Sequence, residues 1–197
     1  IGFMKELFFI FSILVIINGN NLIDGVNGNL ALTNIIQLIS VGLLAVMVGD
    51  DVIVQLSCLL LLPLIVFALF NFPFGKIFCG DTGAYFYGFA ISALVIYLFG
   101  TYDDLLSWNA ILILIYPSIE LLFSFVRKIS SGLSPFTADN KHLHTLIFNK
   151  LLSKYNKTNL SNFMTTFILS PMYIIPTVYI SFCYSNVNLY SIFFQHQ

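Results

Sequence analysis

Long apolar runs alternate with short polar segments along the chain, and the runs are longer than the helices of a small soluble core require. A helix needs about 20 predominantly apolar residues to cross the hydrocarbon core of a bilayer. Prolines inside such runs are tolerated, because neighbouring groups satisfy the carbonyl that a proline leaves free. The pattern predicts an all-α, polytopic transmembrane helix bundle with about six spans. The predicted spans are Phe3–Leu22, Leu30–Val48, Val52–Phe74, Ala84–Tyr102, Leu105–Val126 and Phe163–Cys183.

Composition supports this reading. Hydrophobic residues make up 58% of the 197 residues and charged residues only 9%, which excludes an ordinary soluble domain. No linker or repeat divides the sequence, so we expect one membrane domain over residues 1–197, with a long loop at residues 127–162. Because Ile1 is not a start methionine and a span follows at once, we expect the sequence to be part of a longer protein.

The basic residues lie almost entirely on one side of the predicted topology. When loops alternate between the two sides, seven of the eight Lys and Arg residues share the side of loop 127–162, and Lys5 is the exception. By the positive-inside rule this side is cytoplasmic. Asp24 and Asp81 also lie there. We therefore expect an integral protein of the plasma (inner) membrane with its active face toward the cytoplasm and with no nucleic-acid partner.

A first polar segment, Asn18–Gly28, follows the first predicted span. On a helix, Asn18, Asn21 and Asp24 are three residues apart and share one face, so their polar groups converge. The glycines that follow let the backbone turn or approach a ligand closely. A polar helix end capped by glycines is the simpler alternative for such a short motif.

A second polar segment, Phe78–Tyr85, opens the fourth predicted span and contains Asp81 between two glycines. An aspartate at a helix start can serve as an N-cap. It can equally offer a carboxylate oxygen to Mg²⁺, which binds few carboxylates together with substrate phosphates. The segment alone leaves both readings open.

The third polar segment lies in loop 127–162, where His142 and His144 accompany Arg127 and Lys141. These side chains form a cationic, hydrogen-bond-donating patch suited to phosphates. A solvated basic loop is the alternative, and zinc is not expected without a further ligand. Glu120 stands alone in a predicted span, where an ionised group needs a partner. Arg127, on nearly the same helix face, is the candidate partner.

Taken together, the three segments resemble the polyprenyl-phosphate sugar-1-phosphate transferases of glycosyltransferase family 4. That family carries an N-x-x-N-x-x-D-G-x-[DN]-G motif, a G-D-x-G motif and a His-rich loop in this order. The run from Arg127 to His144 resembles its WecA/TagO-like branch more than the related phospho-MurNAc-pentapeptide translocases. The resemblance covers about residues 3–152 and implies that the chain is a C-terminal portion.

The resemblance implies a reaction in which a sugar 1-phosphate, of N-acetylhexosamine type for this branch, passes from a UDP-sugar to polyprenyl (undecaprenyl) phosphate. The products would be a polyprenyl-diphosphate sugar and UMP, for cell-envelope polysaccharide biosynthesis. By position in the motifs, Asp81 and Asn21 would hold Mg²⁺, with Mn²⁺ as the alternative ion. Asp24, Asp81, His142 and His144 would be the catalytic residues.

The same resemblance implies the substrate contacts. Phe78 would stack on the uracil and Asn27 would hydrogen-bond it, while the histidines and Arg127 would face the diphosphate. The residues implied in substrate binding are Asn18, Asn21, Asn27, Phe78 and Arg127. Both a monomer and a homodimer are compatible with the sequence.

One family feature is absent from the cytoplasmic side of this sequence. A D-D-x-x-D motif on an earlier loop is expected upstream of Ile1, so the chain alone is expected to be catalytically incomplete. Two other functions remain open at this point. An ion-coupled transporter would need polar residues near mid-membrane, where only Glu120 lies. A non-catalytic homologue would keep the binding surface without the activity.

Overall fold

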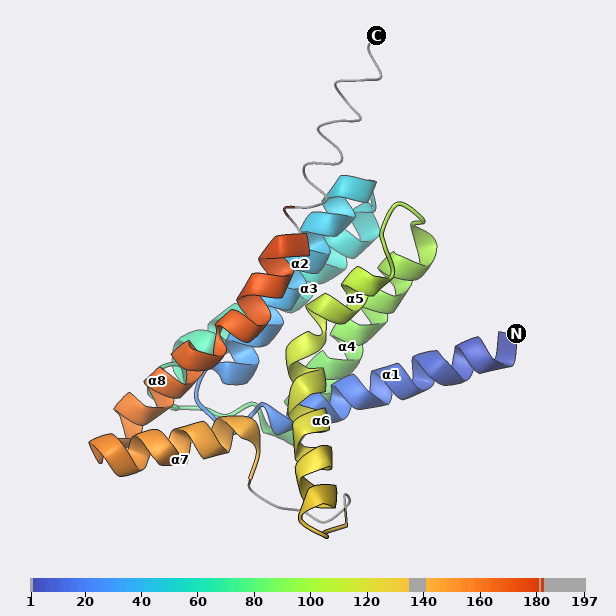
Figure 1. The fold of residues 1–197 in the computed structure, drawn as a ribbon. Helices are drawn as coiled ribbons and strands as arrows, with labels where there is room; N and C mark the ends of the chain where they lie inside the picture. Colours follow the sequence, from blue (N-terminus) through green and yellow to red (C-terminus); the bar gives the residue numbers. More distant parts are fainter. Residues whose placement is uncertain (1, 135–140, 181, 183–197) are drawn as a thin grey trace.

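The computed structural model describes residues 2–134, 141–180 and 182, and within these ranges the chain is helical and has no strand (Figure 1). This confirms the all-α prediction. The helices are α1 (Gly2–Leu22), α2 (Asn29–Val48), α3 (Asp51–Asn71), α4 (Gly80–Thr101), α5 (Trp108–Ile113), α6 (Ile115–Ser130), α7 (Leu143–Tyr155) and α8 (Thr158–Leu169).

Five helical segments in the described residues are long and apolar enough to cross a membrane. They are α1 from Phe3 onward, α2, α3, α4, and the segment Thr158–Ile180 that begins with α8. The chain is therefore a multi-pass membrane protein. The fifth predicted span, Leu105–Val126, is wrong as a continuous helix, because it breaks at Leu114 into α5 and α6.

Proline explains the break. Pro117 has no N–H group, so the carbonyl of Ile113, one turn earlier, loses its helical partner. The side-chain amide of Gln37, buried on α2, donates to this carbonyl at 2.9 Å. In the same way Pro171 frees the carbonyl of Phe167, which accepts a hydrogen bond from the Ser170 hydroxyl at 2.8 Å. Both broken helices thus keep their backbone groups satisfied inside an apolar bundle.

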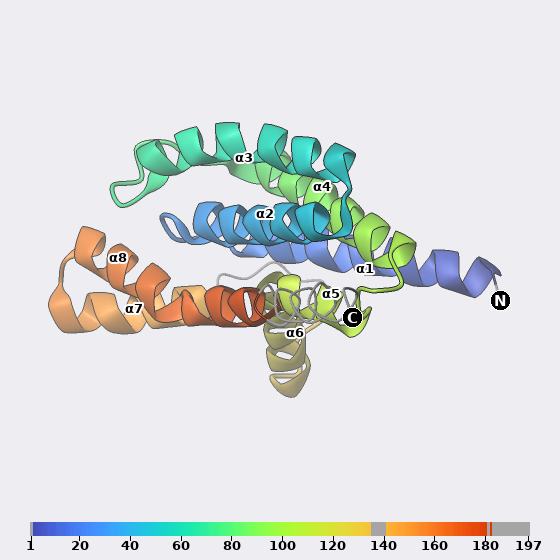
Figure 2. The same cartoon turned by 90° about the horizontal axis from the view of Figure 1, so that it is seen from above.

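The helices pack as two hairpins joined by crossing helices (Figures 1 and 2). Helices α2 and α3 form one hairpin, α7 and α8 form the other, α4 packs on α1 and α2, and α6 packs on α1. Helices α1 and α4 approach closely at Gly88, where an added Cβ would lie 2.9 Å from the Cα of Ile17. The main core lies between α1, α2, α3 and α4 and includes Leu38, Leu44 and Leu98.

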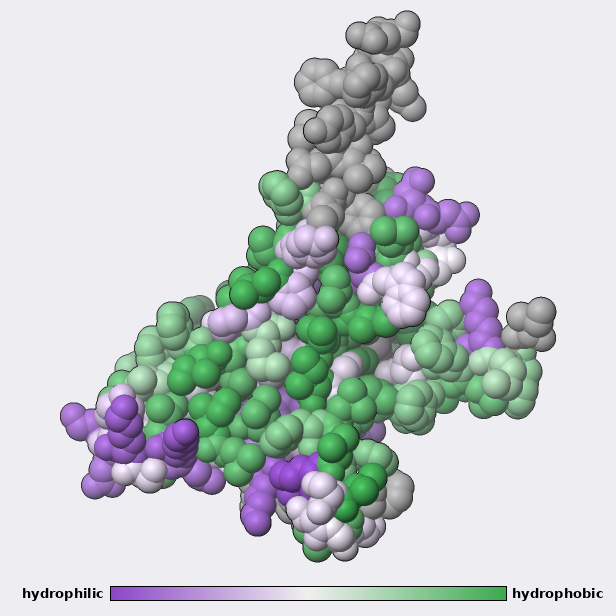
Figure 3. Space-filling view, viewed as in Figure 1, coloured by the Kyte–Doolittle hydropathy of each residue, from purple (hydrophilic) through white to green (hydrophobic). Residues whose placement is uncertain are grey.

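The connections between helices fall at two opposite ends of the bundle. The α2–α3 and α4–α5 connections share one end, where the Tyr102 hydroxyl donates to Asp50 at 2.9 Å. The segment after α1, the segment before α4 and the start of α7 share the other end, which we call the site end. Hydrophilic side chains gather over the α7–α8 turn and the last turns of α6, and an apolar belt lies between the ends (Figure 3).

Loop 127–162 contains structure that the polar pattern did not predict. Helix α6 continues to Ser130, α7 lies inside the loop, and α8 begins at Thr158. Helix α7 ends where Asn156 adopts a left-handed conformation, with φ of 51°. Residues 135–140, in the middle of the run from Arg127 to His144, lie outside the described residues.

Candidate active site

Two asparagines fasten the end of α1 to the start of α4. Asn20 is almost fully buried and its Nδ2 donates to the carbonyl of Ala84 at 2.7 Å. Asn21 donates through Nδ2 to the Tyr85 hydroxyl at 3.1 Å, which leaves its amide oxygen for a ligand. The first and second polar segments, about 60 residues apart in the sequence, therefore form one surface. The sequence did not predict a role for Asn20, because the three-residue spacing selected Asn18, Asn21 and Asp24 on another face of the helix.

Asp24 and Asp81 are brought together by this attachment. The Asp24 carboxylate accepts a hydrogen bond from the backbone N–H of Gly80, at the start of α4. The pKa of Asp24 is raised to about 6, mainly by burial and also by the charge of Asp81, although the Gly80 bond and the charge of His144 act to lower it. An ionised Asp24 is thus costly in the protein alone, and a nearby cation would favour it.

The donor set at this place suits a hard divalent cation that keeps other ligands. Among the described ranges, no three His, Cys, Asp or Glu side chains cluster closely enough to enclose a metal ion. Asp81 is exposed in the first turn of α4, next to half-buried Asp24 and near Asn21. Mg²⁺ binds through one or two carboxylates plus phosphates and water, so these oxygens fit it and do not fit a closed zinc site.

His144 lies on the other side of Asp24, held by Glu120. The His144 ring is buried, and its Nδ1 is 2.9 Å from Oε1 of Glu120. Its Nε2 lies directly against Gly25, at a spot that an added Cβ would occupy. The predicted pairing of Glu120 with Arg127 is therefore wrong. The start of α7 packs against α6 at Glu120, a contact between two helices that spacing within one helix cannot reveal.

His142 completes the α7 side of the site. Its ring stacks on that of His144 with centroids 5.6 Å apart, and its Nδ1 is 2.8 Å from the Ser124 hydroxyl of α6. Arg127 is half-buried on a neighbouring face of α6. His144 thus lies against the segment that follows α1, and His142 lies between His144 and α6.

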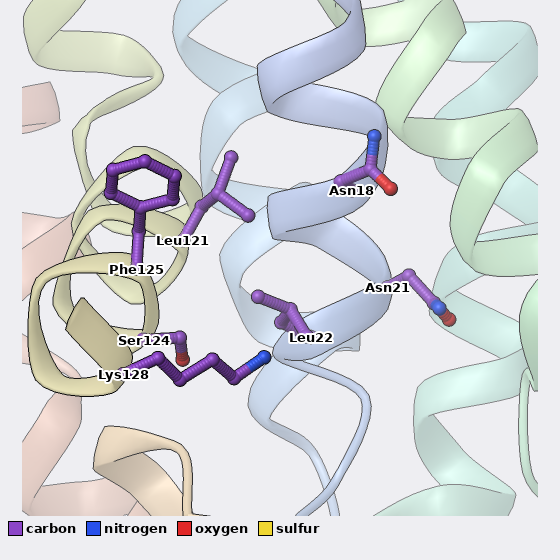
Figure 4. Close-up of a pocket in the computed structure, with 7 residues that line it drawn as sticks. All are labelled: Asn18, Asn21, Leu22, Leu121, Ser124, Phe125 and Lys128. Carbon is purple, nitrogen blue, oxygen red and sulfur yellow. The ribbon is translucent and has the colours of Figure 1, made fainter. Parts of the chain in front are cut away.

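A small cavity of about 130 Å³ opens beside these residues, between α1 and α6 (Figure 4). Its polar lining comes from Asn18, Asn21, Ser124 and Lys128. Lys128 is only 8% exposed, and its amine extends from α6 toward the end of α1. The remaining lining is apolar and consists of Leu22, Leu121 and Phe125. Sequence reasoning did not select Ser124 or Lys128.

Asn27 and Phe78 occupy different environments. Asn27 is buried, its Nδ2 donates to the carbonyl of Pro73 at 3.0 Å, and its own carbonyl accepts from Thr166 at 2.7 Å. It therefore joins the α3–α4 connection to α8. Phe78 is 70% exposed just before α4. The predicted uracil contacts of both residues stay predictions.

Comparison with known proteins gives one matching family. The profile of glycosyl transferase family 4 matches residues 1–99. No solved structure matches the chain.

Three curated relatives illustrate the similarity. The probable undecaprenyl-phosphate N-acetylglucosaminyl 1-phosphate transferase of Bacillus subtilis (strain 168) is 32% identical over 147 residues, which is 73% of this chain and 40% of the relative. The undecaprenyl-phosphate alpha-N-acetylglucosaminyl 1-phosphate transferase of Thermotoga maritima is 30% identical over 77% of this chain and 46% of its own. The decaprenyl-phosphate N-acetylglucosaminephosphotransferase of Mycobacterium leprae is 31% identical over 66% of this chain and 37% of its own. The chain spans less than half the length of each of these relatives.

Proposed function

Because the chain belongs to glycosyl transferase family 4, we propose that it acts in the transfer of a sugar 1-phosphate, of N-acetylhexosamine type, from a UDP-sugar to polyprenyl phosphate. An oxygen of the lipid phosphate forms a bond to the β-phosphorus of the UDP-sugar. The bond from that phosphorus to the bridging oxygen breaks, and UMP leaves with the electron pair. The names of the relatives, which specify N-acetylglucosaminyl 1-phosphate and undecaprenyl or decaprenyl phosphate, support this choice of substrates.

The observation that carries the proposal is the convergence of Asp24, Asp81 and His144 at one end of a membrane bundle. They come from three segments far apart in the sequence, and each segment holds one of the polar motifs. Two carboxylates can hold a divalent cation that neutralises the charge of a diphosphate, and the imidazole can donate a hydrogen bond to it. Phosphoryl transfer depends mainly on such charge stabilisation and on the positioning of the substrates. A transporter path would instead need such groups distributed through the membrane.

The proposed cofactor is Mg²⁺, with Mn²⁺ as the alternative ion. Asp81 and Asn21 would hold it, with Asp24 beside them, and when bound it would supply positive charge to the diphosphate. In the chain itself, the Gly80 N–H orients the Asp24 carboxylate. His142, His144 and Arg127 would donate hydrogen bonds to phosphate oxygens, and Phe78 and Asn27 would contact the uracil.

The cavity between α1 and α6 supports a lipid phosphate as the acceptor. Lys128 and Ser124 at its polar side can bind a phosphate, while Leu22, Leu121 and Phe125 provide apolar surface for the first part of a prenyl chain. An amphipathic cavity at a membrane surface suits a phosphorylated lipid better than a soluble acceptor. In this proposal the site end faces the cytoplasm of the plasma membrane, because the basic residues of α6 and α7, and Lys157 between α7 and α8, lie there.

A direct assay tests the proposal. Membranes that carry the full-length protein are supplied with radiolabelled UDP-GlcNAc, Mg²⁺ and undecaprenyl phosphate, beside an Asp81→Asn variant. We expect labelled lipid that requires Mg²⁺ and is lost in the variant. No labelled lipid from well-expressed, folded protein with UDP-GlcNAc or a panel of other UDP-sugars would contradict the proposal and favour a non-catalytic homologue.

A further inference from the structure

Glu120 is a completely buried carboxylate whose contacts connect α6 with the start of α7. Its Oε2 accepts the backbone N–H of Leu143 at 3.0 Å, and its Oε1 accepts the backbone N–H of His144 at 3.1 Å. The Tyr116 hydroxyl donates to Oε1 at 3.2 Å, and Asn29 in turn donates to Tyr116 at 2.8 Å. A buried ionised group with this many donors is well compensated.

These contacts make Glu120 the cap of α7. The first N–H groups of a helix have no partner within the helix. The residue that precedes α7, His142, makes no side-chain capping bond, and the two oxygens of Glu120 take its place. A negative charge at a helix N-terminus is favourable, so the start of α7 is fixed to α6.

The same carboxylate determines how the His144 ring is oriented. Both Glu120 oxygens already accept backbone N–H groups, so the hydrogen between Oε1 and the imidazole belongs on Nδ1 of His144. Nε2 then points the other way, against Gly25. The ring has no room to shift toward α1, because even a methyl group at Gly25 would overlap Nε2.

We propose that Glu120 and Gly25 are positioning residues that clamp the His144 ring between them, with Nδ1–H held by Glu120 and Nε2 presented to the Asp24 side of the site. The inference rests on the proposed function for the role of Nε2, which, in the doubly protonated ring, donates to a phosphate oxygen of the diphosphate. Glu120 acts only through His144 and α7 and does not touch the substrate. Tyr116 and Asn29 extend the support into the bundle core.

One test reads the ring directly, without any activity. The full-length protein is labelled with ¹⁵N-histidine in lipid nanodiscs, and the signals of His144 are those missing from the spectrum of a His144→Asn variant. We expect a protonated Nδ1 in the wild type. In Glu120→Gln the amide cannot accept from both backbone N–H groups and the ring, so we expect a mixture of ring forms. Glu6→Gln, an exposed position on α1, is the matched control.

A second test reads the consequence for transfer. Glu120→Gln and Gly25→Ala are expected to lower kcat by about 10- to 100-fold, as loss of a supporting partner does at other sites, with little change in KM for the UDP-sugar. Gly100→Ala is the control for the second variant, because an added Cβ there meets nothing within 4 Å. Gly25→Ala leaves the bonds of Glu120 to the backbone N–H groups of α7 in place, so it separates ring position from capping of α7.

Two results would overturn the inference. The first is an unprotonated Nδ1 of His144 in the wild type. The second is a wild-type kcat in Gly25→Ala. If Glu120→Gln does not fold, the wild-type spectrum and the kcat of Gly25→Ala still test the inference. If the wild-type protein transfers no sugar phosphate at all, the proposed function fails, but the spectra test the clamp independently.

Discussion

The two ends of the bundle use the same residue type in opposite ways. Asp50, between α2 and α3, is buried and has both oxygens occupied, because Oδ1 accepts the N–H of Ile53 at 3.0 Å and Oδ2 accepts from Tyr102 at 2.9 Å. Asp24, at the site end, accepts one backbone N–H, faces the like charge of Asp81, and has its pKa raised to about 6, mainly by burial. Carboxylates that stabilise a fold are satisfied within it, whereas those of a binding site are left to be satisfied by a ligand.

The largest effect should come from removing one site-end charge. Asp81→Asn keeps the shape of the side chain but halves its capacity as a cation ligand. We expect transfer by the full-length protein to fall by about 100-fold or more, as with other losses of transition-state charge stabilisation. Asp103→Asn, at the opposite end, is the control and should keep wild-type activity. An equal loss of transfer activity in both variants would contradict a functional difference between the two ends of the bundle.

A smaller effect is expected at the cavity between α1 and α6. Lys128→Met retains the length and apolar stem of the side chain but removes its charge. We expect KM for polyprenyl phosphate to rise by about 10-fold, the equivalent of one charge-assisted hydrogen bond of about 1.4 kcal/mol. KM for the UDP-sugar should change little. Lys154→Met, on the exposed end of α7, is the control, and the same rise there would indicate a general charge effect.

At the opposite end of the bundle, Asp50→Ala should lower the stability of the fold and leave the transfer reaction unchanged. The variant loses the cap of α3, which costs about 1 kcal/mol. For a protein of this size that free energy corresponds to a fall in Tm of about 2–4 °C. Specific activity of the folded fraction should match the wild type, measured after correction for folded protein. A catalytic defect in fully folded Asp50→Ala would contradict the structural role of this end.

The smallest expected effect is a change with pH in the free energy of unfolding, caused by the titration of Asp24. Because its folded pKa, about 6, lies above the ordinary value of 3.8, the folded state holds the proton more tightly than the unfolded state. Without divalent cation, stability is therefore lost as pH rises from about 4 to above 6. Asp24→Asn should be more thermostable than the wild type at pH 8, and the difference should vanish near pH 4. A difference of the same size at both pH values would contradict this reasoning.

The sequence could predict the features that depend on neighbouring residues, but not the contacts between segments that lie far apart in the chain. Span lengths follow from local composition, so α1 to α4 were predictable, and so was the side that holds the three motifs. The break at Leu114 was not, because it needs Gln37 from α2 to satisfy the carbonyl of Ile113. The Glu120–His144 pair joins residues on two helices, and no periodicity within α6 indicates it.

The side chains that sequence reasoning missed share one property. Asn20, Ser124 and Lys128 are polar but buried at the contacts between helices. Their roles depend on which helix lies opposite, while Asp24 and Asp81 were identifiable from motifs alone. Spacing therefore found the exposed and half-buried polar residues of the motifs, and the structure was needed to find the buried ones between helices.

Binding of Mn²⁺ by the full-length protein in the presence of UDP, measured by electron paramagnetic resonance, tests the difference between the two ends most directly. We expect bound Mn²⁺ in the wild type and in Asp103→Asn, and a loss of affinity of about 10-fold or more in Asp81→Asn. Unchanged Mn²⁺ affinity in Asp81→Asn would contradict a cation site at the end that holds Asp24 and Asp81.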